Sequence, residues 1–258
     1  GGQHHRHHGG DALGELRPCW LWEGPRAGDA EASPAVYFAP HDASGHQFSF
    51  FRKRSAASRM QPHDLPRERI AAAKVLHLSG ISAAISDSAC DTCFAAVDAA
   101  KAAGVQVSFD TTLRLKPWPI ARARAVMREL IRQSDICLPR LEDVQAISGL
   151  QEPDALVEFC LALGAKVVAL KMGAQGALVS DGSACWQLPP HRCQPVDATG
   201  AGDTFGGTLL ARLVAGDALR DAARYAVVAS ALSTQGYGAV EPIPRAEQVR
   251  AALRDYPA

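Results

Sequence analysis

The segment with the clearest chemistry is the run Val196-Asp197-Ala198-Thr199-Gly200-Ala201-Gly202-Asp203-Thr204-Phe205. Gly200 and Gly202 have no Cβ, so their backbone can approach a ligand closely. The run leads into an apolar stretch that predicts a helix, and the N–H groups at a helix start attract anions. We therefore expect Gly200, Ala201 and Gly202 to form an anion hole.

Asp203 is an acidic residue at the same helix start. A carboxylate there would repel a phosphate, so phosphate binding alone does not explain it. It is explained if Asp203 takes a proton from an attacking hydroxyl while the amides hold the developing phosphoryl charge. The alternative is that Asp203 only caps the helix. The length of the whole string favours the catalytic interpretation, because it is far more specific than a lone glycine-rich loop.

The elements that must position this loop alternate along the chain. Predicted strands cover residues 75–79, 105–109, 136–138, 167–170 and 177–179. Predicted helices cover a short segment capped by Asp64 and including Ile70, then residues 87–103, 120–132, 153–163, 204–215, 218–234 and 244–255. Strands that alternate with helices of this length predict an α/β fold with a mostly parallel sheet covered on both faces.

The chain before this alternation has two parts. Residues 1–34 are rich in glycine, histidine, proline and acidic residues, and we expect a poorly ordered tail, a tag or a fusion scar, with metal binding as the less favoured alternative. Residues 35–59 predict a β-hairpin, with strands at 35–39 and 46–51 around a turn at 41–45. Residues 60–258 are then expected to form the α/β core.

Composition excludes several classes of protein. The 258 residues carry 27 Lys plus Arg and 27 Asp plus Glu, and a net charge of zero argues against a general nucleic-acid binder. No stretch approaches the ~18 apolar residues of a membrane span, and no signal peptide is evident. Seven scattered cysteines, an odd number, are typical of reduced thiols. These features predict a cytoplasmic protein without a membrane or nucleic-acid partner.

The run around Asp203 resembles the signature of the ribokinase-like sugar kinases, the phosphofructokinase-B family, in which a Gly-Ala-Gly-Asp element holds the catalytic base. The resemblance implies a three-layer α/β sandwich with a small β lid, and ATP and Mg²⁺ as cofactors. The family's first strand and its Gly-Gly element are not found at the start of this chain. An N-terminal strand is therefore expected to be missing.

A second stretch, Lys171-Met172-Gly173-Ala174-Gln175-Gly176, matches the family's Lys-x-Gly-x-x-Gly nucleotide element. Taken alone, this hexad is more often a β-turn between strands. Two residues of the helix after the catalytic loop could line the adenine site, although helical spacing alone would place them in the core. The resemblance thus implies ATP contacts from Lys171, Gly173, Gly176, Thr199, Val227 and Ala231.

Two further stretches bear on cations. Leu138-Pro139-Arg140-Leu141-Glu142-Asp143 falls where the family has its Asn-x-x-Glu element, with Asp143 in place of the Glu. The resemblance implies that Asp143 helps to hold Mg²⁺, although an acidic residue at a helix start is equally explained by the helix dipole. Residues 236–239 resemble the family's closing turn, whose carbonyls are expected to hold a monovalent cation.

Three stretches resemble those of family members that phosphorylate 2-keto-3-deoxygluconate: residues 50–59, 77–82 and 108–114. This sugar acid carries a carboxylate, which a planar guanidinium matches bidentately. The resemblance implies substrate contacts from Tyr37, Phe50, Arg52, Arg114 and Asp203. Charge alone would equally make the basic run after the hairpin a solvated flank, and pairing alone would make Tyr37 and Phe50 packing residues.

The resemblance implies ATP-dependent phosphorylation of the terminal hydroxyl of 2-keto-3-deoxygluconate. One alternative is a kinase for a neutral sugar such as fructose or ribose, which would not require Arg52 and Arg114. Another is an inactive remnant that still binds nucleotide. An exposed lid hairpin favours a homodimer or a higher homo-oligomer.

Overall fold

The computed structural model describes residues 36–38, 41–42, 45–46, 49–51 and 55–257. The expected tail at 1–34 and the side chain of Arg52 lie outside these residues. The described residues before Val167 and those from Val167 onward fall into two compact units, here called the first and the second unit.

The predicted hairpin has a longer ladder than expected. β1 (Val36–Phe38) pairs antiparallel with β4 (Ser49–Phe51), which places Tyr37 opposite Phe50. The turn was expected at 41–45, but β2 (His41–Asp42) pairs with β3 (Gly45–His46), so the pairing continues toward the tip. The turn prediction was wrong because polar residues can extend an antiparallel ladder through backbone hydrogen bonds alone. The role of this hairpin as a lid stays a prediction.

The strands of the first unit are parallel and in sequence order. β5 (Val75–Ser79) pairs with β6 (Gln106–Asp110), and β6 pairs with β7 (Ile136–Leu138). Ser79, Asp110 and Leu138 share one register at the ends of their strands. Carboxyl ends of parallel strands form the edge at which open α/β sheets bind ligands. The segments that follow β6 and β7 therefore leave the sheet at its binding edge.

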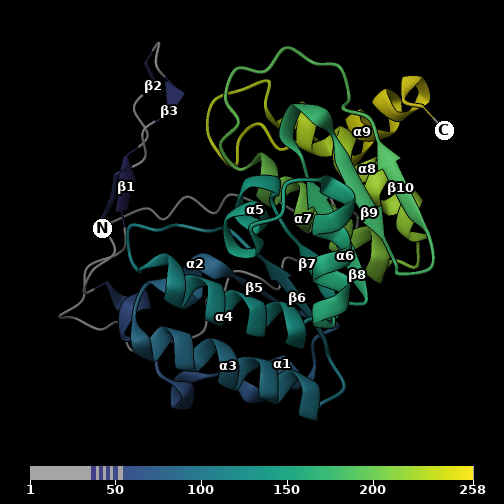
Figure 1. Ribbon diagram of the computed structural model, residues 1–258. Coiled ribbons are helices and arrows are strands. Elements are labelled where there is room, and N and C mark those ends of the chain that lie inside the picture. Colours follow the sequence, from purple (N-terminus) through teal and green to yellow (C-terminus); the bar gives the residue numbers. More distant parts are fainter. Residues whose placement is uncertain (1–35, 39–40, 43–44, 47–48, 52–54, 258) are drawn as a thin grey trace. The chain divides into compact units, whose positions relative to one another are not determined.

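The helices of the first unit pack around these strands (Figure 1). They are α1 (Arg67–Ala71), α2 (Gly80–Ala84), α3 (Asp87–Ala102), α4 (Ile120–Gln133), α5 (Leu141–Ser148) and α6 (Pro153–Leu163). The side chains that are almost fully enclosed come from strands and helices alike and include Phe109, Met127, Leu130, Ile131, Leu138 and Ile147. This apolar core holds the strand ends in place.

The first helix of this unit begins later than predicted. A helix was expected from Asp64, but Pro62–Asp64 is a short 3-10 turn in which Asp64 Oδ2 accepts the Gln61 N–H at 2.9 Å. Leu65 is extended, and α1 begins only at Arg67. Pro66 explains the shift, because proline disfavours a helical conformation for the residue before it.

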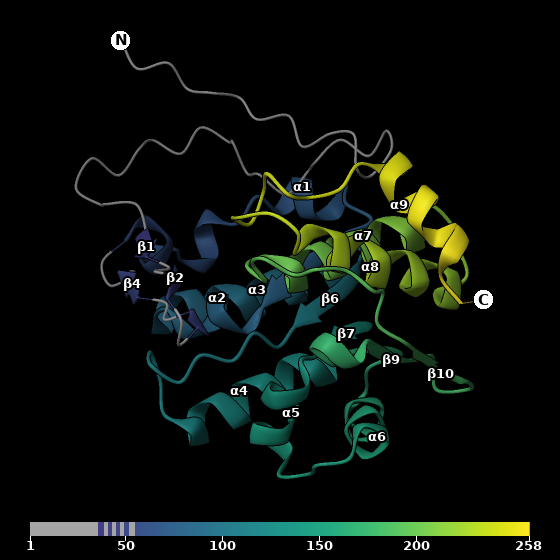
Figure 2. The ribbon, with the colours of Figure 1, turned by 90° about the horizontal axis from the view of Figure 1, so that it is seen from above.

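The second unit combines three antiparallel strands with three described helices. β8 (Val167–Lys171) pairs with β9 (Ala177–Ser180), which pairs with β10 (Cys185–Leu188). The helices are α7 (Ala201–Val214), α8 (Leu219–Ser233) and α9 (Ala246–Ala252). α7 and α8 lie side by side in both views (Figures 1 and 2), and α8 also packs against β9 and β10. None of the helices within residues 55–257 has the length and apolar character needed to cross a bilayer.

Candidate active site

The predicted anion hole lies at the start of α7, and Gly200 fixes its shape. Gly200 is the N-cap residue, with a left-handed φ of +78°. A Cβ at this position would lie 2.9 Å from the Cα of Ala239, so both conformation and space require glycine. The Ala201 N–H bonds the Ala198 carbonyl at 3.2 Å, and the Thr204 N–H bonds the Gly200 carbonyl at 2.8 Å. The chain therefore turns sharply into the helix.

A buried acid that sequence reasoning missed as a site residue organises this turn. Asp197 is 2% exposed, and its Oδ1 accepts the Thr199 N–H at 2.8 Å. Its Oδ2 accepts the N–H of Gly238 at 2.9 Å, which ties the loop to the turn at residues 236–239. The only available signal was an acid placed among small and apolar residues, where a charge needs partners.

α8 secures the same helix start from the other side. Ser230 lies on α8, and its hydroxyl donates to the Ala201 carbonyl at 2.8 Å. The start of α7 is thus held both by the preceding loop and by the neighbouring helix. Such fixed geometry allows backbone dipoles to stabilise charge without reorganising.

Asp203 is the third residue of α7, and its side chain is exposed, in contrast to the buried Thr204 and Phe205 that follow it. A carboxyl group that packed into the interior could not act on a substrate hydroxyl. The exposed position of Asp203 is therefore compatible with a role as the catalytic base.

Lys171 brings a positive charge to the anion hole. It is the last residue of β8, and its Nζ lies 3.7 Å from the position that a Cβ on Gly202 would occupy. An ammonium group and the N-terminal end of a helix dipole therefore converge on one point. Both features favour an anion such as a phosphate group.

The turn after Lys171 has two glycines with different roles. Gly176 has a φ of +86°, and a Cβ there would lie 2.1 Å from the Leu188 carbonyl oxygen, so close packing against the end of β10 requires it. Gly173 has a φ of +57°, but no atom lies within 4 Å of its would-be Cβ. Close packing alone explains why residue 176 is a glycine, with no need for a ligand. The space beside Gly173 is open.

Two threonine hydroxyls near the helix start are buried without a hydrogen-bond partner among the described residues, namely those of Thr199 and Thr204. Buried hydroxyls in proteins are usually satisfied. Thr199 is a predicted ATP-binding residue, and its contact with ATP stays a prediction. On α8, Val227 is 6% exposed and Ala231 is half-buried, so their contact with adenine stays a prediction.

In the first unit, Arg114 lies on a tightly bonded turn after β6. Asp110 Oδ1 accepts the Thr112 N–H at 3.1 Å and its hydroxyl at 2.6 Å. Thr112 has a φ of +30°, which a β-branched residue rarely adopts. Arg114 is half-buried, and its Nη1 donates to the Leu113 carbonyl at 2.8 Å. The guanidinium of Arg114, the predicted substrate contact, is thus held in a defined orientation.

Asp143, the predicted Mg²⁺ ligand, is engaged with the same turn. Its Oδ2 accepts the Thr111 hydroxyl at 2.9 Å and the Leu113 N–H at 3.0 Å. Burial raises the pKa of this carboxyl, and the two hydrogen bonds and the charge of Arg140 offset only part of the effect. No group of three or more His, Cys, Asp or Glu side chains within residues 55–257 could hold a metal ion. These residues do not fit a protein-made Mg²⁺ cage. Mg²⁺ bound through substrate phosphates would not need one.

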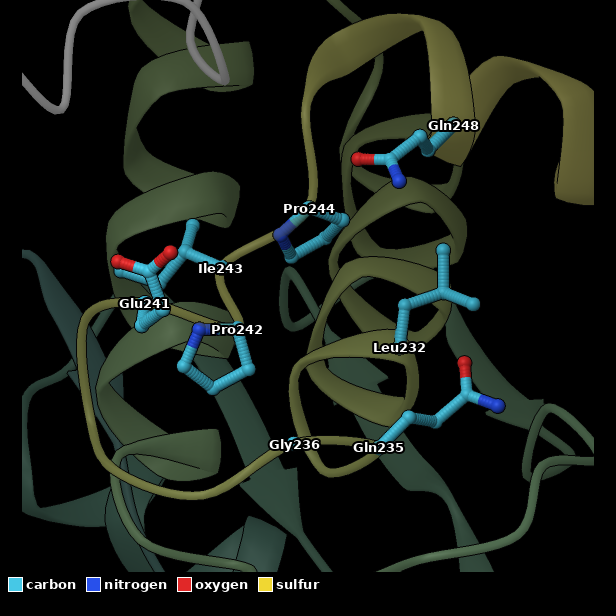
Figure 3. A pocket seen from close by; sticks show the side chains of 8 residues that line it. All are labelled: Leu232, Gln235, Gly236, Glu241, Pro242, Ile243, Pro244 and Gln248. Atoms are coloured by element: carbon cyan, nitrogen blue, oxygen red, sulfur yellow. The ribbon is translucent and has the colours of Figure 1, made fainter.

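A cavity of about 360 Å³ lies in the second unit, between the end of α8 and the loop before α9 (Figure 3), and it reaches the turn at residues 236–239 through Gly236. It is lined by Leu232, Gln235, Gly236, Glu241, Pro242, Ile243, Pro244 and Gln248. None of the predicted catalytic or ATP-binding residues lines it. We therefore place the candidate site at the start of α7 and not in this cavity.

The predicted residues are divided between the two units. The second unit holds Asp203, the anion hole and the six predicted ATP-binding residues, and it brings Lys171 to Gly202. The first unit holds the paired strands of Tyr37 and Phe50, and it brings Asp143 to the turn of Arg114.

Comparison with known proteins gives three findings. The family model described as pfkB family carbohydrate kinase matches residues 28–246. The chain is 28% identical over 209 residues to the 2-dehydro-3-deoxygluconokinase of Bacillus subtilis, covering 80% of this chain and 64% of that protein. It is 31% identical over 231 residues to the 2-dehydro-3-deoxygluconokinase of Thermoproteus tenax, covering 88% of this chain and 70% of that protein. The chain thus spans less than two thirds of the Bacillus protein.

A solved structure extends the similarity to the fold. The fructokinase of Vibrio cholerae, bound to fructose, ADP and a calcium ion, matches with a TM-score of 0.76 and 27% identity, covering 84% of this chain and 73% of that one. The expected ribokinase-like α/β fold class is confirmed by this agreement.

Proposed function

Because the chain belongs to the pfkB family of carbohydrate kinases, we propose that it transfers the γ-phosphoryl group of ATP to the terminal hydroxyl of 2-keto-3-deoxygluconate. The observation that carries the proposal is the start of α7, where the exposed Asp203 follows the Gly200 turn and Lys171 Nζ lies over Gly202. A base, a dipole and a cation at one point are the parts that phosphoryl transfer to an alcohol needs.

In the proposed reaction, Asp203 accepts the proton of the sugar hydroxyl as that oxygen attacks the γ-phosphorus. The bond from the γ-phosphorus to the bridging oxygen of ATP breaks on the opposite side, and ADP leaves with that oxygen. The backbone N–H groups at the helix start and the Lys171 ammonium hold the charge on the transferred phosphoryl oxygens. Mg²⁺ entering with ATP would neutralise further phosphate charge. Asp197 keeps the loop in shape by bonding Thr199 and Gly238.

The proposed substrate class depends on Arg114 and on the predicted contact from Arg52. A sugar acid presents a carboxylate that a guanidinium can bind through two parallel hydrogen bonds. The two 2-dehydro-3-deoxygluconokinases support this choice. A neutral sugar is the second candidate, because the fructokinase matches at a similar identity. A monovalent cation at the turn of residues 236–239 and a homodimer through the hairpin remain predictions.

An ADP-release assay on a substrate panel tests the proposal. Purified chain with ATP and Mg²⁺ should turn over 2-keto-3-deoxygluconate with a kcat/KM at least about tenfold above that for fructose or ribose, the discrimination expected from one charge-assisted contact. Preference for fructose would favour the neutral-sugar kinase. ATP binding without turnover of any sugar would favour the nucleotide-binding remnant.

Arg114→Lys sharpens the test, because lysine keeps the charge but loses the bidentate geometry. We expect the KM for the sugar acid to rise about tenfold and the KM for ATP to stay unchanged. Arg124→Lys is the matched control, since Arg124 is an exposed residue of α4 whose guanidinium bonds the Ala146 carbonyl. Equal changes in both KM values would remove the carboxylate role of Arg114.

A further inference from the structure

We propose that Asp143 is a positioning residue that fixes the turn carrying Arg114, and that it does not bind Mg²⁺ directly. The proposal rests on the proposed function in one respect, namely that Arg114 binds the substrate carboxylate. Its structural part concerns only residues of the first unit and stands on the contacts described below.

Asp143 lies where two segments of the first unit meet. It is the third residue of α5, which begins just after β7 at the binding edge of the sheet. It is 6% exposed, and its Oδ2 accepts two hydrogen bonds from the turn after β6, from the Thr111 hydroxyl and the Leu113 N–H. The carboxylate thus joins two segments that are about thirty residues apart in the chain.

Leu113 links Asp143 to Arg114 through its two backbone polar groups. Leu113 donates its N–H to Asp143 and accepts the Arg114 guanidinium at its carbonyl oxygen. Both backbone polar groups of Leu113 are therefore held, one by the buried acid and one by the side chain that is expected to meet the substrate. Loss of the Asp143 bond would free the Thr112–Leu113 peptide, which adjoins the Leu113–Arg114 peptide whose carbonyl accepts the Arg114 guanidinium.

The backbone of the turn is strained at Thr112, so it needs hydrogen bonds from its surroundings to hold it. Thr112 has a φ of +30°, a conformation that costs on the order of 1–2 kcal/mol for a residue with a Cβ. Strain of this kind persists only where surrounding contacts fix it. Asp110 bonds Thr112 within the turn, whereas Asp143 bonds its two neighbours from another element.

Packing supports the same conclusion. Thr111 is fully buried, and its hydroxyl also accepts the N–H of Arg140 at 3.1 Å. Gly80 packs against the turn so closely that a Cβ there would lie 2.0 Å from the Thr111 carbonyl oxygen. The turn is fixed on several sides, and Asp143 supplies the acceptor that two of its buried donors need. A metal ligand would instead need an accessible oxygen and companion ligands.

The test compares Asp143→Ala with Asp143→Asn in the full chain. An asparagine oxygen can accept both hydrogen bonds but carries no charge for a metal. For Asp143→Ala we expect the KM for the sugar acid to rise about 10- to 100-fold, the effect of losing buried hydrogen bonds, with the KM for ATP and the Mg²⁺ requirement unchanged. Asp143→Asn should stay within about threefold of the parent, a much smaller loss than a missing buried bond causes. Thr111→Val should weaken sugar binding in the same direction as Asp143→Ala.

Glu142→Ala is the matched control, because Glu142 is the exposed neighbour on the same helix turn and pairs with Arg140 at 3.4 Å. Amide hydrogen exchange gives a readout that does not depend on activity. The Leu113 amide should exchange at least about tenfold faster in Asp143→Ala than in the parent or Glu142→Ala, because its acceptor is lost. A parent chain inactive on every sugar acid would sink the proposed function and leave this exchange result standing.

Two outcomes would overturn the positioning role. One is a raised Mg²⁺ requirement and lowered kcat in both Asp143→Ala and Asp143→Asn, which is the behaviour of a metal ligand. The other is unchanged exchange at Leu113 in Asp143→Ala.

Discussion

At the residue scale, three aspartates near helix starts differ in surroundings and hence in chemistry. Asp203 is exposed at the start of α7, whereas Asp197 and Asp143 are buried and accept backbone N–H groups. A buried acid that accepts two hydrogen bonds acts as a structural acceptor, whereas an exposed acid lies where a substrate can approach it. Residue type alone does not separate these roles, since each sits close to a helix N-terminus, where the dipole favours any acid.

Replacing Asp203 by asparagine tests the proposed base. The variant keeps the shape of the side chain but cannot accept a proton, so kcat should fall roughly 10²- to 10⁴-fold while the dissociation constant for ATP stays within about threefold. Single-turnover measurement with saturating sugar acid and calorimetric ATP titration give the two quantities. Asp98→Asn on the exposed face of α3 is the control. Turnover of Asp203→Asn near that of the parent would refute the assignment.

Sequence could predict some of these residues and not others. Asp203 and the glycines around it were predictable, because the string Gly-Ala-Gly-Asp is specific in itself. Asp197 and the contacts of Asp143 were not, because their partners lie about thirty to forty residues away in the chain. A hydrogen bond between distant segments depends on strand register and helix placement, which local residue patterns do not encode.

At the element scale, the candidate site depends on how α7 begins. Gly200→Ala should destabilise the second unit and weaken ATP binding, because alanine is strained at a φ of +78° and its Cβ would press on Ala239. Strain alone costs about 1–2 kcal/mol in the free energy of unfolding, and the close contact adds to it. Urea denaturation and ATP titration measure both effects.

Gly182→Ala separates strain from contact. Gly182 has a φ of +83° but no atom within 4 Å of its would-be Cβ, so its alanine variant should show the strain alone and retain ATP affinity. If Gly200→Ala and Gly182→Ala lost equal stability, and neither lost ATP affinity, then the close approach to Ala239 would have no part in shaping the anion hole.

Elements themselves were predicted unevenly. The predicted strands and helices between residues 75 and 163 appear close to their expected bounds, but α2 and α5 lie in this range and were not among the predicted elements. β10 was missed, because Cys185-Trp186-Gln187-Leu188 is short and has no β-branched residue. Its antiparallel pairing with β9 supplies the support that the local residues do not.

At the scale of the whole molecule, the two compact units carry different parts of the proposed chemistry. The nucleotide residues follow β8 and begin α7 in the second unit, whereas Arg114 and its supports belong to the first unit. ATP added alone should therefore stabilise the backbone around Lys171 and the start of α7, and the sugar acid added alone should stabilise the backbone around Arg114. A ligand at 100 times its dissociation constant contributes about 2.7 kcal/mol to the free energy of unfolding of what it binds.

Hydrogen exchange with one ligand at a time tests this division. ATP with Mg²⁺ should slow exchange in residues 172–176 and 199–203, and the sugar acid alone should slow it in residues 112–114, because bound groups protect the amides they contact. Lys171→Ala should abolish the protection by ATP and retain that by the sugar acid, since the Lys171 ammonium lies beside the anion hole of the second unit. Loss of both protections in this variant, despite an unchanged melting temperature, would show that the sugar acid depends on the nucleotide residues and that the proposed assignment of ligands to units is wrong.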